Sequence, residues 1–549
     1  MTYVNRYTLR GCGSVSSRSF EERGRWATRI GLILAMAGNA IGLGNFWRFP
    51  YVLAKNGGGA FMIPYFIALF LLGIPLMWVE WTIGRYGGRY GHGTLGPSFY
   101  LMARERLKPR GAIVFGMIGG MLAFAVTSLL NSYYIHIIGW TAAYTAYSAA
   151  GAYFGADTVE FFLSHVANFP AVLISWCISL ALLGICVGRG ISGGIEKWCR
   201  VMMPTLYAVA IILVIRALTL GSPVKPEWSS IEGLSYIWTP RFDVLAKNFF
   251  IIALAAAGQI FFTLSLGMGI IQNYASYLEP KDDIALSGFT TTTLNEFAEV
   301  ILGGSIAIPI AFAFLGPEQA IKGGVGLSFM ALPNVFSMIG GVGGRAFGTL
   351  WFLLLWFAGF TSAIAMYNYL VALLQEDVGL RRSIGAIAVF IIYLCLGQPI
   401  ALDPTLVYLS ELDNWVGSYL LVVLGLFDLI VAVWLFGPKK FWKELHEGAL
   451  MKVPKAYYYI AMIVAPLYII FLLTGLSWDY ALKGAWSWPP SEYYITNVLG
   501  GPYPQSIPLV IGARIAICVV LIIGAIEAYI AIKKKYSEEL ATNEILVKR

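Results

Sequence analysis

The stretch Gly38–Pro50, GNAIGLGNFWRFP, decides how this chain folds. It lies inside a segment apolar enough to cross a bilayer, yet three glycines, two asparagines and a closing proline weaken its helical hydrogen bonding. Backbone that leaves a helix at that depth is tolerated only where it is buried in protein or lines a wet cavity. Two half-helices meeting there offer N–H groups beside carbonyl groups, and so can hold an anion next to a cation. We therefore expect a binding site here, although glycines in membrane helices also serve close packing.

The composition is that of an integral membrane protein. Of the 549 residues, 58% are hydrophobic and 12% are charged, and the mean hydropathy is +0.71. The net charge of +8 gathers in alternate loops, which is typical of the positive-inside rule and does not indicate a nucleic-acid partner. By this rule both termini face the cytoplasm, and the protein is expected in the cell membrane as a multi-pass chain.

Twelve segments reach the roughly 20 apolar residues that a membrane helix needs. The sequence therefore predicts an all-α membrane protein with twelve transmembrane helices. The predicted spans are 28–54, 59–86, 113–149, 169–187, 196–218, 247–277, 286–314, 344–374, 382–398, 406–436, 456–476 and 506–532.

A second interrupted span is predicted at Gly258–Gly269, GQIFFTLSLGMG. It is the sixth span and the first interruption is in the first span, so the breaks lie five spans apart. That spacing is typical of a five-plus-five inverted repeat, in which both broken helices border the binding site of a transporter.

The repeat predicts a division of the chain into six parts. They are an N-terminal tail (1–25), a first repeat (26–218), an extracellular loop (219–246), a second repeat (247–436), two further helices (437–532) and a C-terminal tail (533–549).

Five motifs resemble the neurotransmitter:sodium symporter family, and the similarity extends from about residue 23 to the twelfth span. What it implies is a LeuT-like inverted repeat with helices 1 and 6 unwound at mid-membrane. The motifs are GNAIGLGNFWRFPYVLAKNGGGAFMIPY (38–65), GIPLMWVEWTIGRYGG (73–88), GQIFFTLSLGMG (258–269), TLNEFAEVILGGS (293–305) and FAGFTSAIAM (357–366).

The resemblance implies two sodium ions, which as hard cations suit uncharged oxygen ligands. The first would be bound by Ala40, Asn45, Thr263 and Asn295, with the substrate carboxylate completing its shell. Read without the family, a Thr–Ser pair on an apolar helix bonds its own backbone. The second ion would be bound by Gly38, Ile41, Ala358, Thr361 and Ser362.

The resemblance also implies an amino acid as the substrate. Position 42 is glycine, where the family's monoamine transporters carry an aspartate that replaces the carboxylate missing from their substrates. Methionines at two pocket positions suggest a pliable cavity for an apolar or aromatic side chain, although a lone methionine is usually core filler. The expected binding residues are Ala40, Leu43, Gly44, Leu130, Tyr134, Phe262, Thr263, Ser265, Met268, Ser362 and Met366.

Charged residues near the membrane core match the family's gates. Arg48 and Asp413 would form the outer gate, and Arg23 and Glu376 the inner one. Glu299 stands where chloride-dependent members have a serine, so a fixed carboxylate there would make chloride unnecessary and could return a proton. The other interpretation of Glu299 is a hydrogen-bonding role alone.

The function predicted from the sequence is sodium-coupled import of an apolar or aromatic amino acid by alternating access. The alternatives are a sodium-dependent binding protein or sensor of the same fold, and a symporter for another small zwitterion. An enzyme is not expected, because HExxH and paired histidines are absent from the sequence. The expected partners are the substrate and the lipid bilayer, and a homodimer is left open.

Overall fold

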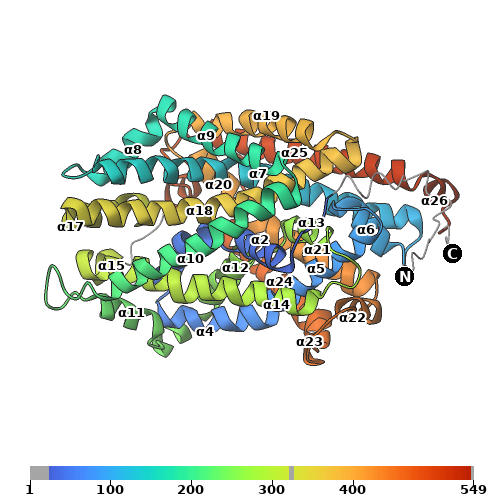
Figure 1. The fold of residues 1–549 in the computed structure, drawn as a ribbon, viewed down its shortest axis with the longest axis horizontal. Coiled ribbons are helices and arrows are strands. Elements are labelled where there is room, and N and C mark those ends of the chain that lie inside the picture. The colour runs from blue at the N-terminus through green and yellow to red at the C-terminus, as the bar shows by residue number, and fades with distance from the viewer. Residues whose placement is uncertain (1–23, 321–326, 546–549) are drawn as a thin grey trace.

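The computed structural model describes residues 24–320 and 327–545. Within them the chain is helical, with no strand (Figure 1). Eleven helices are long and apolar enough to cross a membrane, and a bent pair brings the number to twelve. The all-α prediction with twelve spans is therefore confirmed.

The first six spans follow the predicted order. The first is the bent pair, formed by α2 (Arg29–Ala40) and Gly44–Lys55, which includes α3 (Phe49–Lys55). The others are α4 and α5 (Gly59–Ala68 and Ile74–Arg89), α7 (Pro109–Ala150), α9 (Phe169–Gly188), α10 (Lys197–Leu218), and α12 with α13 (Phe242–Thr263 and Ile270–Ala275).

The last six spans complete the bundle. They are α14 and α15 (Ile284–Glu296 and Gly304–Leu315), α18 (Gly341–Leu373), α19 (Arg382–Ala401), α20 and α21 (Val407–Asn414 and Leu421–Leu429), α23 and α24 (Ala456–Tyr459 and Ala465–Leu482), and α25 (Ile507–Lys535).

Short helices lie at the two ends of the bundle. Figure 1 shows α6, α22 and α26 toward one end and α8, α11 and α17 toward the other. Their bounds are α6 (Leu95–Ala103), α8 (Thr158–Ala167), α11 (Ser230–Trp238), α16 (Pro317–Ala320), α17 (Leu332–Ile339), α22 (Pro438–His446) and α26 (Ser537–Thr542).

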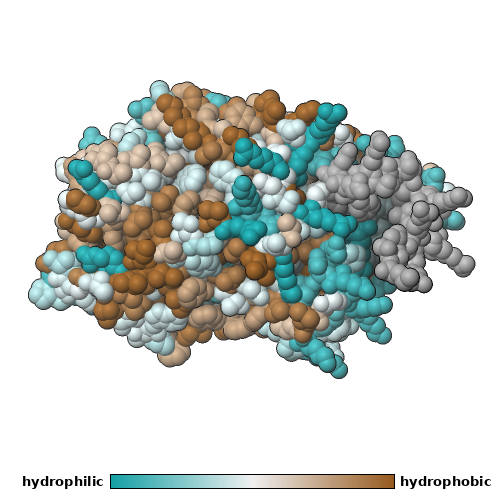
Figure 2. All heavy atoms as spheres, in the orientation of Figure 1, coloured by the Kyte–Doolittle hydropathy of each residue, from teal (hydrophilic) through white to brown (hydrophobic). Residues whose placement is uncertain are grey.

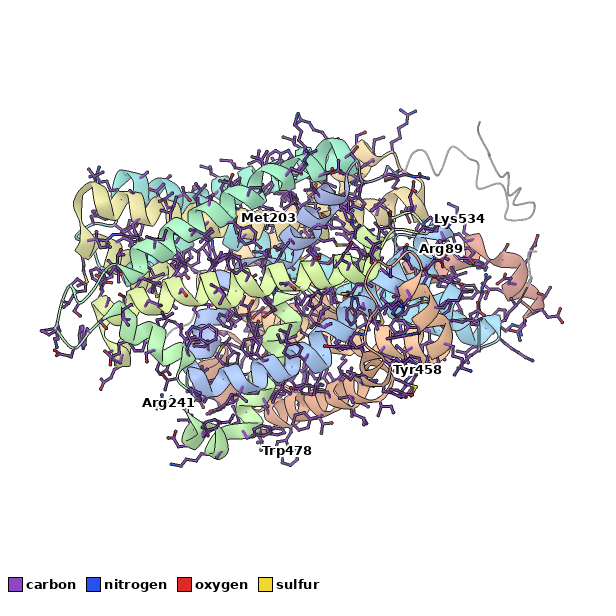
Figure 3. All side chains as sticks on the ribbon, turned by 60° about the horizontal axis from the view of Figure 1, so that its bottom comes forward. Arg89, Met203, Arg241, Tyr458, Trp478 and Lys534 are labelled. Atoms are coloured by element: carbon purple, nitrogen blue, oxygen red, sulfur yellow. The ribbon has the colours of Figure 1, made fainter. Side chains whose placement is uncertain are left out.

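The surface fits a membrane-spanning bundle. Figure 2 shows hydrophobic side chains along much of the visible flank, and hydrophilic ones gathered toward the end that carries α22. Lys534 and Arg89 lie at that same end in Figure 3, and Arg241 lies toward the opposite end.

Both predicted breaks are present. The helix α2 ends at Ala40, and the bend between the two halves of the first span is 44°. In the sixth span, α12 ends at Thr263 and α13 begins at Ile270. Between them Ser265, Gly267 and Gly269 have φ values of +56°, +68° and +79°, a region that favours glycine and rarely holds serine.

π-Helical turns continue two of the elements beside the breaks. One spans Gly44–Arg48 and the other spans Phe297–Gly303, which carries Glu299. The two turns pack together, and a Cβ added to Gly303 would lie 2.2 Å from the carbonyl oxygen of Asn45. Such turns are frequent at functional sites. Their packing places the turn that carries Glu299 against the turn that follows the first break.

Candidate functional site

The two breaks touch through the carbonyl group of Asn39, at the end of α2. The hydroxyl of Ser265 in the second break donates to this oxygen at 3.0 Å. The hydroxyl of Ser362 on α18 donates to the same oxygen at 2.9 Å. One carbonyl thus joins both broken spans to the eighth span.

A small cavity lies where the breaks meet. Its volume of about 20 Å³ is room for roughly one water molecule, so an amino acid would enter only if lining side chains moved apart. The lining residues are Ala40, Gly42, Gly44, Leu130, Tyr134, Phe262, Ser265, Met268, Ile270, Ser362 and Met366.

Most of the predicted binding residues line this cavity, with two exceptions. Thr263 does not line it, and Leu43 donates its N–H to the Tyr134 hydroxyl at 2.9 Å. Two lining residues, Gly42 and Ile270, were not among the predicted binding residues. Gly42 had been singled out only as a mark of substrate class.

The absence of a side chain at Gly42 keeps the cavity open. A Cβ there would lie 2.6 Å from the Ser362 hydroxyl oxygen and 2.6 Å from the Tyr134 hydroxyl oxygen. Real Cβ atoms do not approach that closely, so even alanine would displace one of these hydroxyl groups.

The side chains predicted for the first sodium ion form one hydrogen-bonded chain. The Asn45 side-chain amide donates to the side-chain oxygen of Asn295 at 2.8 Å, and the Asn295 side-chain amide donates to the Thr263 hydroxyl at 3.1 Å. All three side chains are fully buried. Their neutral amide and hydroxyl oxygens are ligands that suit a hard monovalent cation.

The residues predicted for the second sodium ion meet where α2 packs on α18. The hydroxyl of Thr361 donates to the carbonyl oxygens of Phe357 at 2.9 Å and Ala358 at 3.1 Å. The hydroxyl of Ser362 lies 3.3 Å from the Gly38 carbonyl oxygen. Thr361 thus bonds its own helix backbone, whereas Ser362 bonds the end of α2 at the first break.

Glu299 accepts hydrogen bonds from three side chains. Tyr65 donates to Oε1 at 2.9 Å, and Gln259 donates to the same oxygen at 3.1 Å. The hydroxyl of Thr263 contacts Oε2. The Tyr65 hydroxyl also lies 2.8 Å from a carboxyl oxygen of Glu296.

The outer gate residues do not pair with each other. The guanidinium of Arg48 lies 4.5 Å from the ring centroid of Phe262, and Asp413 accepts the Tyr133 hydroxyl at 2.7 Å. Within the described residues no ion pair joins Arg48 to Asp413. Arg48 therefore covers the aromatic ring that lines the cavity.

At the inner gate, Arg23 lies outside the described residues. Its predicted partner Glu376 accepts the N–H of Gly93 at 2.7 Å. The neighbouring Asp377 pairs with Lys535 at the end of α25 at 2.7 Å. The C-terminal end of the eighth span is thus bonded to the loop before α6 and to the last span.

Asn39 is a candidate functional residue that the sequence analysis did not include among the site residues. Its side chain is 1% exposed, and neither its amide nitrogen nor its amide oxygen has a hydrogen-bond partner in the described part of the chain. A buried polar group without a partner is costly, which marks the position as a candidate. The sequence did point to it, because Asn39 lies in Gly38–Pro50 directly before the first break.

Comparison with known proteins gives consistent results. The sequence matches the sodium:neurotransmitter symporter family over residues 23–156 and 158–534. An uncharacterised sodium-dependent transporter of Methanocaldococcus jannaschii is 31% identical over 496 residues, which cover 88% of this chain and 96% of the relative. The sodium- and chloride-dependent glycine transporter 1 of Xenopus laevis is 25% identical, over 82% of this chain and 78% of its own.

A solved structure has the same fold. The crystal structure of MhsT in complex with L-phenylalanine superposes with a TM-score of 0.71 at 29% identity, over 83% of this chain and 100% of MhsT. The family match covers both broken spans and the helices that pack on them. The chain is therefore a multi-pass, sodium-dependent transporter and belongs to the sodium:neurotransmitter symporter family.

Proposed function

We propose that this protein imports an apolar or aromatic amino acid together with two sodium ions, by alternating access and without chloride. The observation that carries the proposal is the cavity between the breaks. It combines backbone polar groups at Ala40, Gly42 and Gly44 with apolar walls that include Met268 and Met366.

The polar end of the cavity suits an α-carboxylate. The N–H of Leu43 and the hydroxyl of Tyr134 are already bonded to each other, so a substrate carboxylate would accept from both donors in place of that contact. A side chain at position 42 would occupy this space. Gly42 therefore supports an amino acid over an amine as the substrate.

The other end of the cavity suits an apolar side chain. Thioethers adapt to irregular shapes, and Phe262, Leu130 and Ile270 complete an apolar wall. The similar MhsT has been crystallised with L-phenylalanine. We infer that this chain takes substrates of the same apolar or aromatic class.

Chloride independence is supported by the contacts of Glu299. An anion needs hydrogen-bond donors around it, and here Tyr65, Gln259 and Thr263 are directed at the carboxyl group. The carboxyl group of Glu299 would thus take the place of a chloride ion and accept the hydrogen bonds that the ion would otherwise accept. Proton return through Glu299 is part of the proposal and would appear as substrate-dependent proton movement.

The deciding experiment is uptake by purified protein in sealed proteoliposomes. We expect concentrative uptake of phenylalanine or leucine with an inward sodium gradient and no change when chloride is replaced by gluconate. Sodium-dependent binding without concentrative uptake would instead indicate a binding protein or sensor. Selective uptake of another zwitterion, with no apolar amino acid accepted, would contradict the substrate class.

A paired variant tests the role of Glu299. Glu299→Ser should make uptake depend on chloride, because three donors then surround a space without an anion. Glu318→Ser is the matched control, since this glutamate is exposed at the start of α16, and it should leave uptake chloride-independent. Uptake by Glu299→Ser that ignores chloride would contradict the assignment.

A further inference from the structure

A second acidic pair lies inside the bundle, away from the residues proposed to bind the ions. Glu80 is on α5 and Asp428 is on α21, and both side chains are 0% exposed. The two helices pack against each other, and the carboxyl groups accept hydrogen bonds from residues five positions apart beside the second break, Gly267 and Gln272. None of these residues is part of the proposed substrate, sodium or Glu299 sites.

The pair has more hydrogen-bond acceptors than the surrounding described residues have donors for. Glu80 Oε1 accepts the N–H of Gly267 at 2.7 Å, and Asp428 Oδ1 accepts the amide of Gln272 at 3.1 Å. Within the described residues, Glu80 Oε2, Asp428 Oδ2 and Gln272 Oε1 have no hydrogen-bond partner. Three buried oxygens without a donor call for a proton, a cation or a water molecule, and only the first two also offset the negative charge.

No positive side chain balances the pair. Among the described residues neither carboxyl group makes an ion pair, whereas the equally buried Glu411 is 2.6 Å from Arg514. Arg85, further along α5, is bonded to Glu444 of α22. The charged residues on the other long helices packed against α21 lie near helix ends: Arg110 on α7, Asp243 and Lys247 on α12, and Asp479 on α24.

Two uncompensated negative charges cannot remain adjacent inside the bundle. Burying one charge already raises the free energy of the folded state, and a second negative charge beside it raises that free energy further. Two carboxyl groups that share a site resolve the conflict by sharing one proton. We propose that Glu80 and Asp428 bind one proton between them, and that this proton is a ligand of the protein distinct from any proton carried by Glu299.

The position of the pair gives the proton a structural role. Gly267 lies in the second break with a φ of +68°, and a Cβ there would lie 2.0 Å from the Leu421 carbonyl oxygen on α21. Glu80 bonds the break from one side while Asp428 shares the helix that packs on its other side. A proton between them joins α5 and α21 across the second break.

Infrared difference spectroscopy of purified protein at neutral pH tests the proposal directly. A protonated carboxyl group has a C=O stretching band that an ionised carboxylate lacks. The double variant Glu80→Gln/Asp428→Asn should lose such a band, and each single variant should lose or shift it. Amide side chains keep the size of the originals and the acceptor for Gly267, which favours folding.

The matched control is Glu411→Gln, which removes a carboxylate that is equally buried but paired with Arg514. It should remove no protonated carboxyl band. If the double variant, monodisperse and stabilised by sodium like the wild type, also loses no band, both carboxyl groups are ionised and the proposal is wrong. This measurement does not depend on transport, so it can fail while the proposed function stands.

A pH titration of thermal unfolding gives a second measurement. Raising the pH removes the shared proton and leaves two adjacent negative charges, so the unfolding midpoint of the wild type should fall on the alkaline side. The double variant Glu80→Gln/Asp428→Asn should lack that fall, because neither amide side chain titrates. Equal alkaline slopes for the two proteins would overturn the proposal.

Discussion

Gly42 shows how much of this site depends on a single missing atom. The Ser362 and Tyr134 hydroxyl groups each lie 2.6 Å from the position that a Cβ would take. The residue at this position therefore controls the space that the proposed substrate carboxylate would take.

Gly42→Ala should weaken sodium-dependent binding of phenylalanine by roughly ten- to a hundredfold, since overpacking costs about 1–3 kcal/mol. Scintillation proximity binding measures this change. Gly258→Ala is the control, because a Cβ at Gly258 would meet no atom within 4 Å, and it should bind like the wild type. Equal affinities for the two variants would contradict the placement of the carboxylate at Gly42.

At the scale of elements, α20 and α25 are joined by a buried ion pair. Arg514 donates to Glu411 at 2.6 Å and to the Ala485 carbonyl oxygen at 2.6 Å. Tyr494 donates to the other oxygen of Glu411 at 2.6 Å. These bonds fix the end of α20, which also carries the outer gate residue Asp413.

Arg514→Ala should destabilise the protein by about 3–5 kcal/mol, because it leaves the carboxylate of Glu411 buried without its partner. Lys483→Ala is the control, since the Lys483–Asp479 pair is solvent-accessible and such pairs contribute about 0.5 kcal/mol. The two thermal unfolding midpoints in detergent give the comparison. Midpoints that coincide would show that this ion pair does not hold the two helices together.

The helix α8 carries a buried histidine. His165 is 4% exposed, with the Tyr147 hydroxyl 3.3 Å from Nδ1. Burial lowers the pKa of His165 from 6.5 to about 4. The unfolded chain therefore takes up a proton before the folded protein does, and the folded state loses stability as the pH falls below 6.5.

The loss attributable to His165 should reach about 1.4 kcal/mol for each pH unit between those two pKa values. Thermal unfolding of the wild type and of His165→Gln across this range measures it. The wild-type midpoint should fall more steeply on acidification, because glutamine does not titrate. Parallel curves for the two proteins would contradict a buried, neutral His165.

At the scale of the whole molecule, the proposed sodium ligands come from four separate spans. Asn45 lies after the first break, Thr263 at the end of α12, Asn295 on α14 and Thr361 on α18. Ions bound there would tie these spans together. Binding to the folded state alone raises its stability with ion concentration.

Sodium should therefore raise the unfolding midpoint of the wild type relative to choline, and the rise should shrink in Thr361→Val. The control is Thr293→Val, because Thr293 also bonds the carbonyl four residues earlier at 2.9 Å but is exposed. It should keep the full sodium effect. An undiminished effect in Thr361→Val would remove this residue from the second ion site.

The amino-acid sequence by itself determined the spans and both breaks. Glycine, asparagine and proline act on their own stretch of backbone, so Gly38–Pro50 and Gly258–Gly269 revealed the interruptions without knowledge of any neighbour. The glycine at position 42 favours an amino acid as substrate only through the resemblance to the family, and that substrate class stays a proposal.

Only the tertiary structure decided which polar groups meet. Asp413 bonds Tyr133 instead of pairing with Arg48, and the carbonyl of Asn39 joins three spans. Glu80 and Asp428 each lie alone in an apolar run of sequence, yet they accept hydrogen bonds from Gly267 and Gln272, five positions apart beside the second break. The physical reason is that a membrane helix is held by hydrogen bonds within its own segment, so the residues of that segment show where the helix forms and where it breaks. Contacts between spans depend instead on how the helices rotate and pack.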